Sequence, residues 1–89
     1  MTNTRSKPWF VYILRCADHT LYTGITQDTT RRLIEHNEDN RLAARYTRVR
    51  RPVQLVYTES QANRSAAAQR EAAIKQLSRL EKEALIKTT

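Results

Sequence analysis

The apolar positions of the chain fall into short runs separated by polar segments. Residues 9–16 are mostly aromatic or β-branched and apolar on both faces, a pattern typical of a central strand. Residues 21–26 predict a second strand, and the turn-forming residues between the two runs predict a hairpin. Gly24, the only glycine, lies inside the second strand, where glycine often marks a bulge or the close approach of backbone or of a ligand.

The next apolar period predicts a helix over 29–37. Asp28 or Thr29 can serve as its N-cap, and Leu33 with Ile34 is expected on its core side. The polar run after it ends the helix. A basic connector, 41–51, then leads to Pro52.

The C-terminal part of the pattern predicts a third strand, 53–58, and then two helices. Ser60 or Asn63 can cap an alanine-rich helix, and Ser78-Arg79-Leu80-Glu81 has the form of a capping box that opens a separate last helix. One continuous helix is the alternative, because the apolar period barely breaks there. Two sets of residues are expected to face inward: Val53, Leu55 and Tyr57 on one face of the strand, and Leu80, Ala84 and Leu85 on the last helix.

This order of elements, β-β-α-β-α-α, predicts an α+β fold. With 89 residues the chain is expected to form one domain, over 9–87, after a polar tail, 1–8. No apolar run approaches the roughly 18 residues that a membrane span needs, and no secretory signal is visible. Cys16 is the only cysteine, which excludes an internal disulfide and favours the reducing cytoplasm.

The net positive charge of the chain favours functions that involve a negatively charged partner. Sixteen lysines and arginines stand against nine acidic residues, a net charge of +7 that attracts polyanions. The basic connector adds a specific candidate surface, because arginine binds phosphate, tyrosine can stack on a base, and no acidic residue interrupts the run. The alternative is a solvated loop. The candidate nucleic-acid contacts are Arg41, Arg45, Tyr46, Arg48, Arg50 and Arg51.

Candidate chemistry is limited to tyrosine, arginine and carboxylate groups. One glycine cannot build a phosphate loop, and Cys16, His19 and His36 lack the spacing of zinc ligands. Tyr12 and Tyr22 lie on the paired strands, where their hydroxyls could meet, although each could equally be a core aromatic.

Two helical positions add further candidates. Arg32 and His36 are four apart and project from one helix face, either toward a phosphate or simply into solvent. Glu71 is a suitable carboxylate ligand for Mg²⁺, but it can also form an ordinary helical ion pair with Lys75.

The order and spacing of these residues carry a family resemblance. Ten residues separate Tyr12 from Tyr22, ten more lead to Arg32, and four to His36. A resemblance to a known family covers about residues 9–86 and is strongest to its small stand-alone bacterial members. The motifs resemble those of the GIY-YIG nuclease family: Val11-Tyr12-Ile13, Tyr22-Thr23-Gly24, Arg32-x-x-x-His36 and a late helical Glu71, with Val11 and Thr23 departing from the family triplets.

The resemblance implies a three-stranded antiparallel sheet flanked by helices and a set of catalytic roles. Tyr12 would act as general base or position the attacking water, and Tyr22 would orient that water or contact the phosphate. Arg32 would stabilise phosphate charge, and His36 would assist proton transfer or hold Tyr12. Glu71 would hold one divalent ion, Mg²⁺ or Mn²⁺. An unperturbed tyrosine is a poor base at pH 7, so nearby positive charge would have to favour its ionised form.

The sequence therefore predicts a metal-dependent endonuclease acting on nucleic acid, DNA in preference to RNA, without a membrane and with room for a targeting protein partner. Two alternatives stay open. The first is a nucleic-acid-binding module that uses the same basic face without cleavage. The second is an interaction protein whose alanine-rich helix and basic connector contact an acidic partner.

Overall fold

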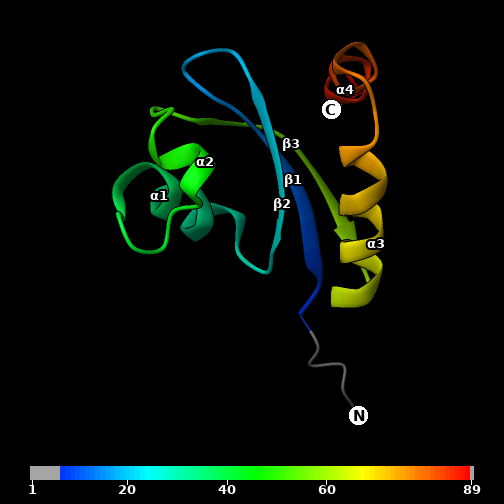
Figure 1. Cartoon of the computed structure of the whole chain (residues 1–89). Helices are drawn as coiled ribbons and strands as arrows, with labels where there is room; N and C mark the ends of the chain where they lie inside the picture. Colours follow the sequence, from blue (N-terminus) through cyan, green and yellow to red (C-terminus); the bar gives the residue numbers. More distant parts are fainter. Residues whose placement is uncertain (1–6, 89) are drawn as a thin grey trace.

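The architecture is a three-stranded antiparallel sheet with helices on both faces, seen in a computed structural model that describes residues 7–88 (Figure 1). Most of the predicted tail 1–8 lies outside the described residues. The predicted α+β class and antiparallel sheet are confirmed. The strands are β1 (Trp9–Arg15), β2 (Leu21–Thr26) and β3 (Gln54–Gln61), in the spatial order β2-β1-β3.

Polar side chains begin the three longer helices, as the sequence predicts. Asp28 and Asn63 accept hydrogen bonds from backbone N–H groups of their first turns. Ser78 forms both bonds of its capping box, so two helices rather than one continuous helix close the chain. The basic connector also contains one helical turn that was not predicted. The helices are α1 (Thr29–Glu38), α2 (Arg45–Arg48), α3 (Arg64–Lys75) and α4 (Arg79–Ile86).

The two sheet faces carry separate cores. α3 and α4 cover one face and α1 and α2 the other, with the sheet between them (Figure 1). Side chains alternate along β1, so Val11 and Ile13 pack toward α3, whereas Tyr12 and Leu14 pack toward α1 and α2. Tyr12 therefore lies on the face that also receives the basic connector.

A bulge in the pairing of β1 with β3 changes one prediction. Ile13 pairs with Tyr57, but the next residue, Leu14, pairs with Leu55, so one residue of β3 is left over. The extra residue turns Tyr57 to the α3 face, while Val53 and Leu55 stay on the other. The expectation that all three share a face was wrong.

Three other residues expected in the core are exposed. Leu33 and His36 turn inward from α1, which leaves Ile34 52% exposed. In α4 a different face packs on the sheet: Leu80 is 80% exposed and Ala84 is exposed too, while Leu85 and Ile86 pack against the core. A bidentate ion pair between Arg15 of β1 and Glu83 holds α4 in that orientation, with N–O distances of 2.7 and 2.8 Å.

Candidate active site

The centre of the site is the buried hydroxyl of Tyr12, which lies over β2 at Gly24. The two residues are directly opposite each other in the β1–β2 pairing, and Tyr12 is 2% exposed. A Cβ at position 24 would lie 2.6 Å from Cζ of the Tyr12 ring and would overlap its hydroxyl. Gly24 thus provides the space for the Tyr12 side chain, whereas the sequence predicted a bulge or an approach by backbone or ligand.

His36, on α1, is the hydrogen-bond partner of the Tyr12 hydroxyl. Tyr12 Oη and His36 Nε2 are 2.8 Å apart, and the imidazole is fully buried. The other ring nitrogen, Nδ1, lies 2.7 Å from Oγ1 of Thr47 on α2. Thr47 is fully buried as well. Thr47 was not among the predicted site residues, because it lies among arginines in a segment expected at the surface, and its place between Tyr46 and Arg48 carries no local signal.

Aromatic rings build the rest of the cluster. Tyr22 lies edge-on to His36, with ring centroids 5.4 Å apart, and stacks on Tyr46 at 5.9 Å. The guanidinium of Arg50 lies 3.8 Å above the Tyr46 ring. The two tyrosines that the sequence singled out, Tyr12 and Tyr22, do come together, and His36 is the group that both rings contact.

Burial keeps both Tyr12 and His36 neutral near pH 7. It raises the pKa of Tyr12 to about 12; the adjacent Arg32 guanidinium lowers this pKa, and Tyr22 and Glu71 raise it. The Arg32 charge does act in the predicted direction, but burial outweighs it. Burial also lowers the pKa of His36 to about 4, with Arg32 and Arg51 acting in the same direction and Glu35 against them.

Arg32, on α1, lies beside the hydroxyl of Tyr12. Its Nη1 donates to Oε1 of Glu35 at 2.9 Å and to the carbonyl of Leu42 at 2.7 Å. These two contacts hold the Arg32 guanidinium in place beside Tyr12. An arginine held in this way keeps its charge and presents its remaining N–H groups in a defined direction.

Glu71 projects from α3, and its negative charge acts on the Tyr12 hydroxyl from there. It forms the expected ion pair with Lys75 at 3.3 Å, and because the Lys75 side chain is 53% exposed, this contact holds the carboxylate only weakly. Over residues 7–88, no group of three or more His, Cys, Asp or Glu side chains could surround a metal ion. A lone carboxylate does fit Mg²⁺, which keeps several waters and takes its other oxygens from a substrate phosphate.

The basic connector divides into arginines that hold its shape and arginines that face solvent. Arg51 donates to the carbonyls of His36 and Asp39 and to Asn40 Oδ1. Arg50 pairs with Asp18 at 3.1 Å and donates to the carbonyl of Tyr46. The three exposed arginines of the segment are Arg41, Arg45 and Arg48, the last of which donates to the carbonyl of Asn40.

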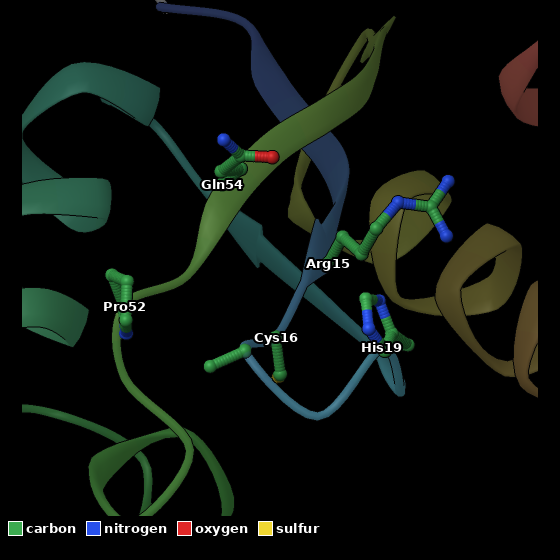
Figure 2. Close-up of a pocket in the computed structure, with 6 residues that line it drawn as sticks. Arg15, Cys16, His19, Pro52 and Gln54 are labelled. Atoms are coloured by element: carbon green, nitrogen blue, oxygen red, sulfur yellow. The ribbon is translucent and has the colours of Figure 1, made fainter.

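An open cavity of about 400 Å³ lies elsewhere, at the end of β1 (Figure 2). Arg15, Cys16 and His19 line one side of it, and Pro52 and Gln54 the other. None of the tyrosine, histidine or glutamate side chains of the candidate site borders it. The candidate site residues around Tyr12 therefore lie apart from this cavity.

Comparison with known proteins identifies the family of the chain. The chain matches the GIY-YIG catalytic domain over residues 8–84. A UPF0213 protein from Desulfotalea psychrophila is 58% identical over 81 residues, covering 91% of this chain and 73% of that protein. A UPF0213 protein from Natronomonas pharaonis is 53% identical over 77 residues, covering 86% of this chain and 88% of that one.

Two solution structures share the fold. Protein EF2693 from E. faecalis is 43% identical with a TM-score of 0.63, and the match covers 99% of this chain and 90% of that one. The UPF0213 protein BH0048 from Bacillus halodurans is 39% identical with a TM-score of 0.58, over 92% and 85% of the two chains. In the described part of the chain, no helix is both long enough and apolar enough to cross a membrane.

Proposed function

Because the chain belongs to the GIY-YIG family, we propose that it is a divalent-metal-dependent endonuclease that hydrolyses phosphodiester bonds in nucleic acid, DNA in preference to RNA. The observation that carries the proposal is the bond from the Tyr12 hydroxyl to His36 Nε2, beside the Arg32 guanidinium. It joins a proton donor, a proton acceptor and a phosphate-binding cation in one place. The lone cysteine agrees with a cytoplasmic enzyme.

The neutral state of the pair defines a proton path. As a water molecule attacks phosphorus, Tyr12 Oη takes a proton from the water and passes its own proton to Nε2 of His36. The tyrosine never has to ionise alone, so its raised pKa does not prevent the reaction. The imidazolium that forms lies in contact with Tyr12. After the P–O bond breaks, it returns its proton to Tyr12 Oη, and Tyr12 gives up the proton it took from the water to solvent or to the leaving oxygen.

Arg32 and the metal ion would stabilise the negative charge on the reacting phosphate. The Arg32 fork would bind the non-bridging oxygens, and Tyr22, which packs on His36, would contact the phosphate or the water. Nucleases of this family generally require a divalent ion. Glu71 would hold Mg²⁺ or Mn²⁺, which supplies Lewis-acid stabilisation of the phosphate and leaving oxygen.

The exposed arginines would guide the strand to this site. Arg41, Arg45 and Arg48 face solvent from the connector, which packs on the same sheet face as Tyr12. We propose that these three bind backbone phosphates. The other expected contacts already have partners within the protein, so we assign them mainly to the shape of the connector: Tyr46, Arg50 and Arg51.

The decisive experiment is cleavage of labelled single-stranded, duplex and branched DNA and of RNA, each with Mg²⁺, Mn²⁺ or EDTA. Wild-type protein is compared with Glu71→Gln and with Glu38→Gln. Glu38 is an exposed carboxylate at the end of α1, so both variants raise the net charge by one. We expect metal-dependent cutting by wild type and Glu38→Gln, and a loss of about 100-fold or more in Glu71→Gln, because a bound metal supplies several kcal/mol.

Binding measurements on the same proteins separate the alternatives. A nuclease should keep its affinity in Glu71→Gln, with a Kd close to that of the Glu38→Gln control. Salt-sensitive binding with no cutting of any substrate would instead identify a non-catalytic nucleic-acid-binding module. Absence of both binding and cutting would favour an interaction protein that contacts an acidic partner.

A further inference from the structure

Thr47 ends a buried chain of hydrogen bonds that starts at Tyr12. Its Oγ1 lies 2.7 Å from His36 Nδ1 and 3.1 Å from the carbonyl oxygen of Ala44. A carbonyl can only accept, so the single hydroxyl proton of Thr47 points to Ala44. The hydroxyl oxygen is then free to accept, and the hydrogen bond to His36 requires the proton of the imidazole to be on Nδ1.

The other end of the chain requires the same arrangement. Among residues 7–88, two side chains lie within hydrogen-bonding reach of the Tyr12 hydroxyl, His36 and the Arg32 guanidinium. Arginine has no acceptor atom, so the Tyr12 hydroxyl can donate its proton only to Nε2 of His36, and Nε2 must therefore carry no proton. An imidazole whose pKa is about 4 carries one proton near pH 7, and that proton is therefore on Nδ1.

We propose that Thr47 is a positioning residue that locks His36 in its Nδ1–H tautomer and so keeps Nε2 open to accept the Tyr12 proton. In the opposite tautomer Nε2 would already carry a proton and could not take another from Tyr12. The catalytic consequence rests on the proposed function, but the tautomer itself does not. A third group that fixes the tautomer of a catalytic base is an established device in hydrolases.

The tautomer is measured directly by long-range proton–nitrogen NMR of the full chain with ¹⁵N-labelled histidine at pH 7. The chain has two histidines, and His19 in the exposed hairpin turn is the internal reference. We expect a pyrrole-type Nδ1 and a pyridine-type Nε2 for His36 in wild type. Thr47→Val, of the same shape but without the hydroxyl, should lose this pattern, and Thr47→Ser should restore it.

A matched control shows that the effect belongs to position 47. Thr23 is also a buried threonine, 4% exposed, and the structure gives its hydroxyl no hydrogen bond within 7–88. Thr23→Val should leave the His36 pattern unchanged. A pyridine-type Nδ1 in wild type would overturn the proposal, even if Thr47→Val did not fold. Retention of the wild-type pattern in folded Thr47→Val would overturn it too.

Cleavage assays on the same variants test the catalytic consequence. If wild type cleaves, kcat of Thr47→Val should fall by roughly 10- to 100-fold, as when an outer partner of a functional histidine is removed, with KM unchanged because Thr47 is buried. Thr47→Ser should recover most of the rate. An unchanged kcat in a variant that has lost the tautomer would refute the positioning role. A wild type that cuts nothing would refute the proposed function, while the NMR result would still decide the tautomer.

Discussion

Replacing Gly24 by alanine tests whether the space for Tyr12 limits this sheet. The φ angle of Gly24 is not positive, so the backbone conformation at this position does not require glycine. The lack of space requires glycine instead, because the new Cβ would lie 2.6 Å from Cζ of Tyr12, well inside the 3.4 Å at which ordinary contact begins. The ring would have to withdraw from β2 by nearly 1 Å.

The expected cost follows from two opposing effects. Overpacking a buried ring costs about 1–3 kcal/mol, whereas alanine in a strand is favoured over glycine by about 0.5–1 kcal/mol. Gly24→Ala should therefore reduce the free energy of unfolding by about 1–2 kcal/mol. For a domain of this size each kcal/mol corresponds to a fall in Tm of about 4–8 °C.

A double-mutant cycle isolates the contact. Tyr12→Leu removes the outer ring atoms and the hydroxyl, so Gly24→Ala in that background should be neutral or stabilising by up to about 1 kcal/mol. Urea unfolding followed by circular dichroism gives the four free energies. An equal cost of Gly24→Ala in both backgrounds would show that the backbone, and not the Tyr12 ring, requires glycine here.

Four further predictions follow from the same geometry. The pKa of His36 is lowered in the folded protein, so below pH 6.5 the unfolded chain binds a proton that the folded protein does not. The free energy of unfolding should therefore have its full value above pH 6.5 and fall by up to about 3 kcal/mol toward pH 4. His36→Gln should flatten the profile of the urea midpoint against pH, and the control His19→Gln should leave it steep. Tyr12→Phe should still fold, with a free energy of unfolding lowered by about 1–3 kcal/mol because buried His36 Nε2 loses its donor, and it should lose cleavage; full activity would remove Tyr12 from the mechanism. Arg51→Ala should lower the free energy of unfolding by about 1–3 kcal/mol, whereas Arg45→Ala should leave it unchanged and weaken nucleic-acid binding in a fluorescence titration. If about five phosphates are neutralised, log Kobs should fall with log salt at a slope of roughly −4.5 on duplex DNA, and a flat titration would exclude a phosphate footprint.

The sequence by itself determined the local structure. Caps and strand alternation act over a few residues, so Asp28, Asn63 and Ser78 begin the three longer helices as predicted. The spacing of Tyr12, Tyr22, Arg32 and His36 likewise pointed to the family. The face that each helix buries was less predictable: Ile34 and Leu80 are exposed, because contacts from distant strands set the rotation of α1 and α4.

Only the tertiary structure decided how the site works. The bond from Tyr12 to His36 spans 24 positions of the chain and the bond from His36 to Thr47 spans 11, distances over which no local periodicity carries information. The bulge opposite Ile13 sends Tyr57 to the far face, which a strict alternation of two cannot foresee. The protonation states are decided in the same way: burial outweighs the charge of Arg32, and burial is a property of the packed chain and not of any single residue.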